Sequence, residues 1–383
     1  MRRRIPILTA ILLSFALLAA ACGDDGGSTD TAAPATTAAP AATEAPSSGA
    51  SDITAAWIYI GQPGDAGWTF AHDQGRQAAE AATGATTLTV ENIAEGSPDF
   101  EQAVRDFIAE GANVVFATSF GYMDDMERLS GEFPDVKFIH ATGFKSNDTN
   151  FTNYFGRVYQ PRYLSGMIAG ATTTSNTIGY VAAFPIPEVI RGINAFTLGA
   201  QATNPDVTVQ VNWTSTWFDP AVEGDAAQAL IDAGADVIAM HQDSTAAGEV
   251  AQKAGARWVS YNSDMSAFAP EAYLTSAIWD WGPYYTSVIE QVAAGTWDST
   301  PYWGGMGDGI VKLGSIASDV DPALVTQVND LGGQMAAGTF EPFTGPLLDQ
   351  DGNEMVAAGV AMDPGAMLGM DWFVQGVDGS TGG

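Results

Sequence analysis

The sequence has a single cysteine, few histidines and none of the common catalytic motifs. Cys22 is the only cysteine among 383 residues, so the chain has no internal disulfide. The three histidines, His72, His140 and His241, form no H-x-x-x-H pair, and no Gly-x-Ser-x-Gly elbow or phosphate-binding loop appears. The sequence therefore lacks the signatures of zinc enzymes, α/β-hydrolases and P-loop proteins. We predict no enzyme activity, no cofactor and no metal.

Basic residues are also scarce. The chain has 14 Lys and Arg against 45 Asp and Glu, which gives a formal net charge of −31. Such a chain repels nucleic acid and anionic lipid headgroups, so we expect neither as a partner. Phosphorylated ligands normally need cationic clamps, and the shortage of Lys and Arg argues against them too.

The first 50 residues have the pattern of an export signal followed by a tether. Three arginines precede an uncharged apolar run that ends in small residues, which is typical of a secretory signal in residues 1–21. The LAAA segment before Cys22 looks like a bacterial lipobox, although Ala19 replaces the usual leucine. We expect a lipid on Cys22; the alternative is a stray cysteine in an ordinary signal. Residues 22–50, rich in Ala, Thr and Pro, then tether an exported body to the extracytoplasmic face of the cell membrane.

In the body, short β-rich runs alternate with stretches of helical period. Several runs are apolar throughout, as in strands buried on both faces. We predict strands at 53–61, 87–93, 113–119, 137–142, 177–184, 207–214, 236–242 and 257–262. Between them, residues 100–110 place four apolar side chains on one helical face, and residues 221–232 have the same design. This order predicts parallel sheets with crossover helices.

Two similar phrases point to two lobes. IAEGANVVFATSF and IDAGADVIAMHQD each place a helix, a glycine turn and a buried strand in the same order. We therefore predict an α/β protein with two lobes, each a parallel doubly wound sheet with flanking helices. Lobe 1 is expected to comprise residues 52–163 and about 273–303, and lobe 2 residues 164–272 and about 304–383. Because ligands of such sheets bind beyond the carboxyl ends of the strands, we expect a ligand cleft between the lobes.

Aromatic residues lie at or after the ends of several predicted strands. Flat rings from two lobes can sandwich a planar ligand, with amides and carboxylates at its edge. The alternative for each ring is packing in a core or between lobes, which we assign outright to Trp57 and Trp258. The aromatic candidates for ligand contact are Trp68, Phe120, Phe184, Trp217, Phe218 and Trp279.

Polar residues follow the same strand ends. His241 and Asp243 close one predicted strand, and another runs directly into Asn262 and Asp264. Asp65 has the alternative of capping a helix. His72 is expected at the surface or as a capping partner, and His140 in the core or at a strand end. The polar candidates are Thr69, His241, Asp243, Asn262 and Asp264, with Asp65 and Asp280 as weaker ones.

These segments resemble the basic-membrane-protein family, whose members are substrate-binding lipoproteins of ABC transporters and include purine-nucleoside receptors. GDAGWTFAHDQG resembles that family's Asp-x-Ser-Phe-Asn loop and following helix, and VSYNSDM resembles its Val-Asp-x-Asp-Gln loop. NAFTLGAQATNPDVTVQVNWTSTWFDP resembles the stretch that carries a second stacking aromatic. The resemblance covers nearly the whole body. It implies a monomer with the two-lobed periplasmic-binding-protein type I fold, a small purine ligand and an ABC permease as partner.

The resemblance also implies residue roles. Trp68 would stack on one face of the base, and Trp217 or Phe218 on the other. Asn262 and Asp264 match the family's two acidic positions, where a carboxylate holds the ribose of a nucleoside.

Two departures from the nucleoside receptors weaken ribose recognition. An acid becomes Asn262, and Trp279 stands where those receptors carry a lysine. The Trp-x-Trp form of Trp279 and Trp281, with GTW, YWGGMGDG and FEPFTGP downstream, resembles the branch of the family associated with free purine bases. The resemblance therefore favours a free base such as adenine or hypoxanthine. The alternatives are a nucleoside receptor, a sensor or a sugar-binding protein of the same fold. A further alternative, an extracellular nucleoside hydrolase, would need a metal-holding Asp cluster near the first strand, where the chain has only Asp65 and Asp73.

Overall fold

The computed structural model describes residues 49–382, and the structural statements below concern this range. The expected signal, Cys22 and nearly all of the expected tether lie outside it. The described residues belong to one compact unit. Between residues 49 and 382, no helix has both the length and the apolar character needed to cross a bilayer.

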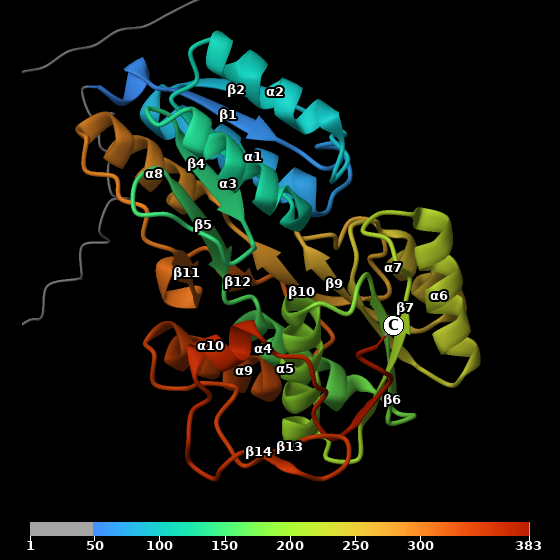
Figure 1. Ribbon diagram of the computed structural model, residues 1–383. Coiled ribbons are helices and arrows are strands. Elements are labelled where there is room, and N and C mark those ends of the chain that lie inside the picture. Colours follow the sequence, from blue (N-terminus) through green and yellow to red (C-terminus); the bar gives the residue numbers. More distant parts are fainter. Residues whose placement is uncertain (1–48, 383) are drawn as a thin grey trace, which may run out of the picture. The chain divides into compact units, whose positions relative to one another are not determined.

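The first sheet is parallel and has the strand order β11-β5-β4-β3-β1-β2 (Figure 1). Its strands are β1 (Thr54–Ile58), β2 (Thr86–Val90), β3 (Val114–Ala117), β4 (Lys137–Ala141), β5 (Phe151–Gly156) and β11 (Tyr302–Gly304). Its helices are α1 (Trp68–Thr83), α2 (Pro98–Ala109), α3 (Met123–Glu132) and α8 (Gly282–Ala294), and a 3-10 turn covers Phe120–Tyr122. Alternate residues of β1 pack into two separate cores. Trp57 shares one core with Ala79 of α1, whereas Ile58 shares the other with Phe100 of α2. Helices therefore bury both faces of the sheet, which explains the apolar runs of β1 and β3.

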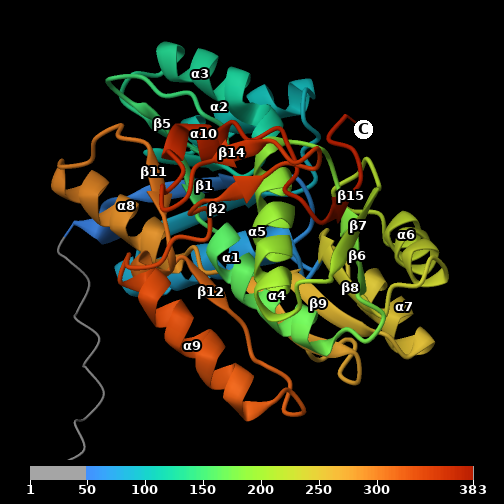
Figure 2. The same cartoon turned by 90° about the horizontal axis from the view of Figure 1, so that it is seen from below.

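The second sheet has the order β12-β10-β9-β8-β6-β7-β15, and only β12 is antiparallel to its neighbour. Its strands are β6 (Thr177–Ala182), β7 (Thr208–Trp213), β8 (Val237–His241), β9 (Arg257–Asn262), β10 (Tyr273–Trp279), β12 (Val311–Leu313) and β15 (Val377–Asp378). Its helices are α4 (Tyr159–Thr172), α5 (Pro187–Thr203), α6 (Pro220–Asp232), α7 (Ala246–Ala254) and α9 (Pro322–Ala336). The C-terminal segment adds β13 (Leu347–Leu348), β14 (Glu354–Val356) and α10 (Pro364–Leu368), which lies near α5 (Figure 2).

The chain passes between the two sheets three times: after β5, after β10 and after β11. As a result α8, late in the sequence, packs against α1. The predicted lobe boundary near residue 273 was wrong, because β10 pairs with β9 in the second sheet, for example Ser276 with Ser260. The crossing comes after Trp279. The strand β5 was not among the predicted strands.

Both sheets reverse their strand order at one point. In the first sheet β2 and β3 flank β1, and in the second β7 and β8 flank β6. In open α/β sheets, ligands bind outside the carboxyl ends of the strands at such a reversal. A ligand is therefore expected near the loops after β1, β3, β6 and β8.

Candidate ligand-binding site

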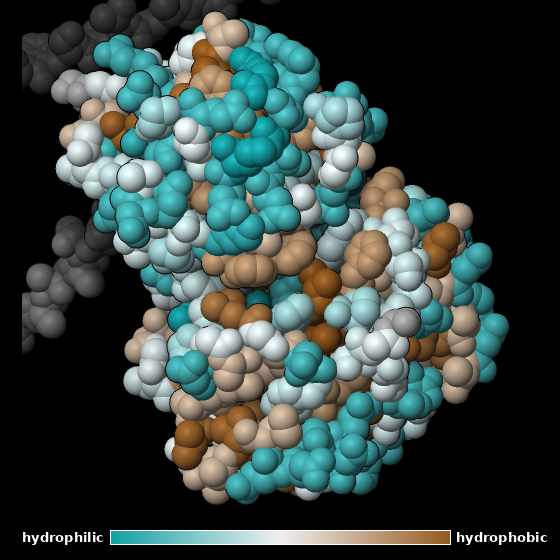
Figure 3. All heavy atoms as spheres, in the orientation of Figure 1, coloured by the Kyte–Doolittle hydropathy of each residue, from teal (hydrophilic) through white to brown (hydrophobic). Residues whose placement is uncertain are grey.

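A narrow pocket lies at these strand ends, and Thr142 after β4, Trp217 after β7 and Tyr261 in β9 complete its lining. The first lobe contributes Ile60, Trp68, Ser119, Phe120 and Thr142, and the second contributes Glu188, Trp217, His241, Asp243 and Tyr261. Its volume of about 30 Å³ is room for roughly two water molecules, so a flat ligand enters only if the walls move apart. In Figure 3, apolar side chains gather across the middle of the molecular face, between regions richer in polar ones.

Trp68 begins α1 and its ring is held on several sides. Its Nε1 donates a hydrogen bond of 2.6 Å to the carbonyl of Thr118. The ring meets those of His72, Trp279 and Trp281 nearly at right angles, with centroids 4.2, 5.7 and 5.9 Å away. Trp68 is therefore a fixed wall of the pocket.

Asp65 caps the start of α1. Its carboxylate accepts hydrogen bonds from the backbone N–H groups of Gly67, Thr69 and Phe70 at 2.8, 3.1 and 2.9 Å. The capping alternative thus describes this residue. Thr69 is buried and lines a wider groove that shares Trp217 and Asp243 with the narrow pocket.

Asp243 ties the two lobes together. Its Oδ1 accepts hydrogen bonds from the backbone N–H of Trp68 at 3.3 Å and from Nδ2 of Asn262 at 2.8 Å. Burial raises the pKa of Asp243 well above its ordinary value, and the charges of Asp65 and Glu223 add to the effect. A carboxyl group with two fixed donors lies on the pocket wall.

Asn262 stands behind Asp243 rather than in the pocket wall. Its backbone has a φ of 69°, a left-handed conformation that Asn tolerates better than most residues. Its Oδ1 accepts a hydrogen bond from Nε1 of Trp279 at 3.2 Å. Both ends of the amide are occupied, so Asn262 orients Asp243.

His241 lies in the pocket wall as a buried ring, 4.3 Å from the centroid of Tyr261. Burial lowers the pKa of His241 well below its ordinary value, and the guanidinium groups of Arg162 and Arg191 lower it further. The imidazole is therefore neutral at physiological pH.

Among the aromatic candidates of the second lobe, Trp217 is the one in the pocket. Phe184 packs edge-on against it, with ring centroids 5.0 Å apart, and so supports Trp217 from behind. Phe218 is 50% exposed and lines two neighbouring grooves instead.

Three other candidates lie away from the pocket wall. Asp264 is exposed, and its carboxylate accepts hydrogen bonds from Oγ of Ser315 at 2.6 Å and from the N–H of Ser266 at 3.0 Å. Trp279 is buried behind Trp68, and Asp280 pairs with Lys312 at 2.8 Å.

The outcomes for the remaining histidines and tryptophans differ. The expectation for His72 was wrong: it is fully buried, stacks on Trp281 at 4.8 Å and lies 2.6 Å from the hydroxyl of Tyr285. Its helix faces α8, which no local pattern reveals. His140 is a buried strand residue as predicted. Trp57 and Trp258, which we assigned to the core, are both fully buried.

Sequence reasoning missed several wall residues. Thr142 has a φ of 64°, rare for a β-branched residue, and its buried hydroxyl has no hydrogen-bond partner within the described range. Burial raises the pKa of Glu188 to about 7, although Arg191 opposes the shift. The proline and acid that open α5 directly after a strand could have pointed to Glu188; no local signal marks Thr142.

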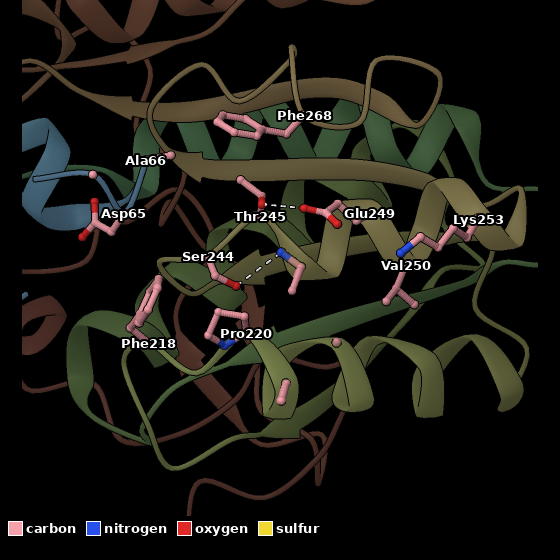
Figure 4. Close-up of a pocket in the computed structure, with 14 residues that line it drawn as sticks. Asp65, Ala66, Phe218, Pro220, Ser244, Thr245, Glu249, Val250, Lys253 and Phe268 are labelled. Carbon is pink, nitrogen blue, oxygen red and sulfur yellow. Dashed lines mark hydrogen bonds between the residues drawn. The ribbon is translucent and has the colours of Figure 1, made fainter. Parts of the chain in front are cut away.

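A second groove, different from the one that Thr69 lines, lies beside the pocket at the amino ends of α6 and α7 (Figure 4). Its polar groups pair with one another. Thr245 donates a hydrogen bond to Glu249 at 3.0 Å, and Oγ of Ser244 accepts one from the N–H of Ala246 at 3.2 Å. The narrow pocket, which gathers rings and polar groups from both lobes, is the better candidate. No group of three or more His, Cys, Asp or Glu side chains within the described part of the chain is arranged to hold a metal ion.

Comparison with known proteins places this architecture in a family. A family model described as "ABC transporter substrate-binding protein PnrA-like" (Bmp) matches residues 53–335. The chain belongs to the Bmp family. A Brucella abortus relative named "Purine-binding protein" is 44% identical over 328 residues, which span 85% of this chain and 93% of that protein.

Another relative of this Bmp-family chain is named for a different ligand. It is the Haloferax volcanii protein named "Putative ABC transporter glucose-binding protein", 40% identical over 86% of this chain and 81% of its own length. Among solved structures, an ABC transporter solute-binding protein from Conexibacter woesei aligns with a TM-score of 0.63 at 24% identity, covering 76% of this chain and 98% of that one. The predicted two-lobed periplasmic-binding-protein fold is therefore confirmed, and the Bmp family is one of ABC transporter substrate-binding proteins.

Proposed function

We propose that this protein binds a free purine base, such as adenine or hypoxanthine, and delivers it to an ABC importer. The observation that carries the proposal is that Trp68 and Trp217, from opposite lobes, line one narrow pocket together with Asp243 and His241. Stacking contributes about 1–3 kcal/mol per aromatic ring in base-binding proteins. The carboxyl and imidazole groups then pair with polar atoms at the edge of the base.

The positions that would hold a ribose support a free base over a nucleoside. Asp264, which matches one acidic family position, is exposed and bound to Ser315 and Ser266. Asn262, at the other position, is occupied by Asp243 and Trp279. Neither side chain is available to the hydroxyls of a sugar attached to the base.

A sugar is the rival ligand, because the Haloferax volcanii relative is named as a putative glucose-binding protein. Each hydroxyl of a hexose needs a hydrogen-bond partner once it leaves water, at a cost of about 1–3 kcal/mol if it finds none. Five of the ten wall residues are instead aromatic or aliphatic: Ile60, Trp68, Phe120, Trp217 and Tyr261. This composition suits a flat heteroaromatic ring better.

The test is calorimetric titration of the chain from Ala45 onward, which includes the compact unit, with adenine, hypoxanthine, adenosine, guanosine, ribose and glucose. We expect a base to bind most tightly and Trp217→Ala to weaken its binding roughly 5- to 150-fold, as the loss of one stacking partner implies. Trp213→Ala is the matched control, because Trp213 packs on Phe373 and bonds to Ser380 outside the pocket. Tight binding of glucose or of a nucleoside, with the free bases silent, would contradict the proposal.

We also propose that the protein is exported, anchored through a lipid on Cys22 and held on a tether at the extracytoplasmic face of the membrane. The support is the cationic, apolar and small-residue order that precedes the sole cysteine. Cys22→Ser should move the protein from the detergent phase to the aqueous phase in a phase-partition assay of whole cells. Retention of the variant in the detergent phase would argue for another mode of attachment.

A further inference from the structure

Behind the pocket, three buried side chains carry polar atoms without partners. Within residues 49–382, Nδ1 of His241, Nε and Nη2 of Arg162 and the hydroxyl of Tyr180 make no hydrogen bond. Leaving a buried polar atom unpaired costs about 1–3 kcal/mol, so a cluster of them indicates a bound partner.

The unpaired atoms surround Gly192 of α5. A methyl group built on Gly192 would lie 3.7 Å from Nδ1 of His241, 3.9 Å from Nε of Arg162 and 4.0 Å from the hydroxyl of Tyr180. The three atoms therefore lie around one point beside Gly192, which has no side chain to fill it. A site with three converging polar partners is what a buried water requires.

Arg162 is fixed independently of this space. Its guanidinium is fully buried, donates from Nη1 to the carbonyl of Met240 at 2.8 Å, and lies 3.9 Å from the ring centroid of Tyr261. Its Nε–H therefore has a defined direction. An arginine side chain only donates hydrogen bonds, so whatever binds there must accept.

We propose that Arg162, Tyr180 and His241 bind one buried water opposite Gly192, and that this water fixes His241 as the tautomer with its proton on Nε2, at the ligand pocket. A water has two lone pairs and two protons. The hydroxyl of Tyr180 has no other acceptor for its proton within the described residues, so it donates to the water, as does Nε–H of Arg162, and both lone pairs are used. Only a water proton is then left for Nδ1 of His241, which must accept it as a bare nitrogen.

The charges around His241 agree with a neutral ring. Arg162 and Arg191 both disfavour the imidazolium form, while Glu188 and Asp243 are the acidic groups in the same pocket wall. Arg162 and Tyr180 are thus positioning residues. The role of this tautomer rests on the proposed function: Nε2–H of His241 is a fixed hydrogen-bond donor for an acceptor nitrogen of a purine ring.

The first test needs no ligand. The untagged chain from Ala45 onward has three histidines, so a long-range ¹⁵N–¹H spectrum contains three imidazole patterns, and a His241→Gln variant assigns the one of interest. We expect His241 to be protonated on Nε2 and unprotonated on Nδ1. A proton on Nδ1, alone or with one on Nε2, would overturn the proposal whatever the ligand is.

The second test fills the water's space. Gly192→Ala adds a methyl group at ordinary contact distances and improves helix propensity, so the fold should survive. We expect the imidazole signals of His241 to change and adenine affinity to fall on the order of tenfold, the loss of one well-placed hydrogen bond. Gly333→Ala, in α9 with no atom within 4 Å of the added methyl, is the control and should change neither.

The two tests separate the inference from the proposed function. Unchanged His241 signals in Gly192→Ala would reject the water site. If the wild-type protein binds no purine while His241 shows the expected tautomer and responds to Gly192→Ala, the purine assignment fails and the water site stands.

Discussion

At the scale of single residues, Thr142 combines an unfavourable backbone with an unsatisfied hydroxyl in the pocket wall. A left-handed conformation costs a residue with a side chain about 1–2 kcal/mol, whereas glycine adopts it freely but loses more entropy on folding. We expect Thr142→Gly to leave the free energy of unfolding unchanged or raise it by about 1 kcal/mol. The same change should weaken purine binding roughly three- to tenfold, because the hydroxyl is lost.

Denaturant unfolding of Thr142→Gly measures the change in the free energy of unfolding, and calorimetric titration measures the change in purine affinity. Asn176→Gly is the control, since Asn176 also has a positive φ of 60° but lies outside the pocket, and it should leave affinity unchanged. A Thr142→Gly variant that binds as tightly as the wild type would show that the hydroxyl does not contact the ligand.

Glu188 should make the stability of the protein depend on pH. Burial raises its pKa in the folded state from 4.5 to about 7, so the stability that its neutral form contributes is complete below about pH 4.5 and is lost as the pH rises through 7. Glu188→Gln remains neutral. Its melting temperature, compared with that of the wild type, should rise between pH 5 and pH 8.

Thermal unfolding at several pH values measures this difference, and Glu354→Gln at an exposed position provides the control. A difference between Glu188→Gln and the wild type that stays constant from pH 5 to pH 8 would mean that Glu188 ionises as it does in the unfolded chain.

Sequence patterns predicted the strand ends well, but they did not predict which side chains there line the pocket and which lie behind its wall. Trp68, Trp217 and Asp243 follow strands and reach the pocket wall, whereas Trp279 ends a strand and lies behind Trp68. The difference depends on the contacts that Trp68, at the start of α1, makes with Trp279 and Asp243 of the second lobe. Such long-range contacts leave no trace in local periodicity.

At the scale of elements, α4 and α5 approach so closely that only glycine fits between them. A methyl group on Gly166 would lie 2.0 Å from the carbonyl oxygen of Phe196, and one on Gly199 would lie 1.9 Å from that of Tyr163. We expect Gly166→Ala to lower the free energy of unfolding by about 1–3 kcal/mol, because the overlap outweighs the better helix propensity of alanine. Denaturant unfolding measures the change.

Gly333→Ala again serves as the matched helical control and should stabilise the protein slightly. Equal stability of Gly166→Ala and the wild type would mean that the two helices separate at little cost.

Strand positions were more predictable than strand partners. The eight predicted strands all occur. Central strands such as β3 and β8 are near-continuous apolar runs, because helices cover both faces of the sheets there. The allocation of 273–279 to lobe 1 failed, because the pairing of β10 with β9 depends on where the chain crosses between the sheets. Residues 151–156, which form β5, are buried throughout, but their mixture of Thr, Asn and aromatic residues hides the strand.

At the scale of the whole molecule, the two lobes approach each other closely at Gly67. A methyl group on Gly67 would lie 2.4 Å from the backbone oxygen of Asp243 and 2.7 Å from its Cα, on the opposite lobe. Because backbone cannot give way as a flexible side chain does, Gly67→Ala must keep the lobes apart. Trp68 and Trp217 would then be too far apart to stack on both faces of a flat ligand.

We expect Gly67→Ala to weaken purine binding at least tenfold and to reduce the ligand-induced decrease in the radius of gyration measured by small-angle X-ray scattering. Gly64→Ala, in the same loop, is the control, because a methyl group there has no atom within 4 Å. If Gly67→Ala bound as tightly and contracted as much as Gly64→Ala, the close approach of Gly67 to Asp243 would not belong to the ligand-bound state. Closure would then have to occur about some other contact, such as the 2.5 Å hydrogen bond from Ser263 to the carbonyl of Ala66.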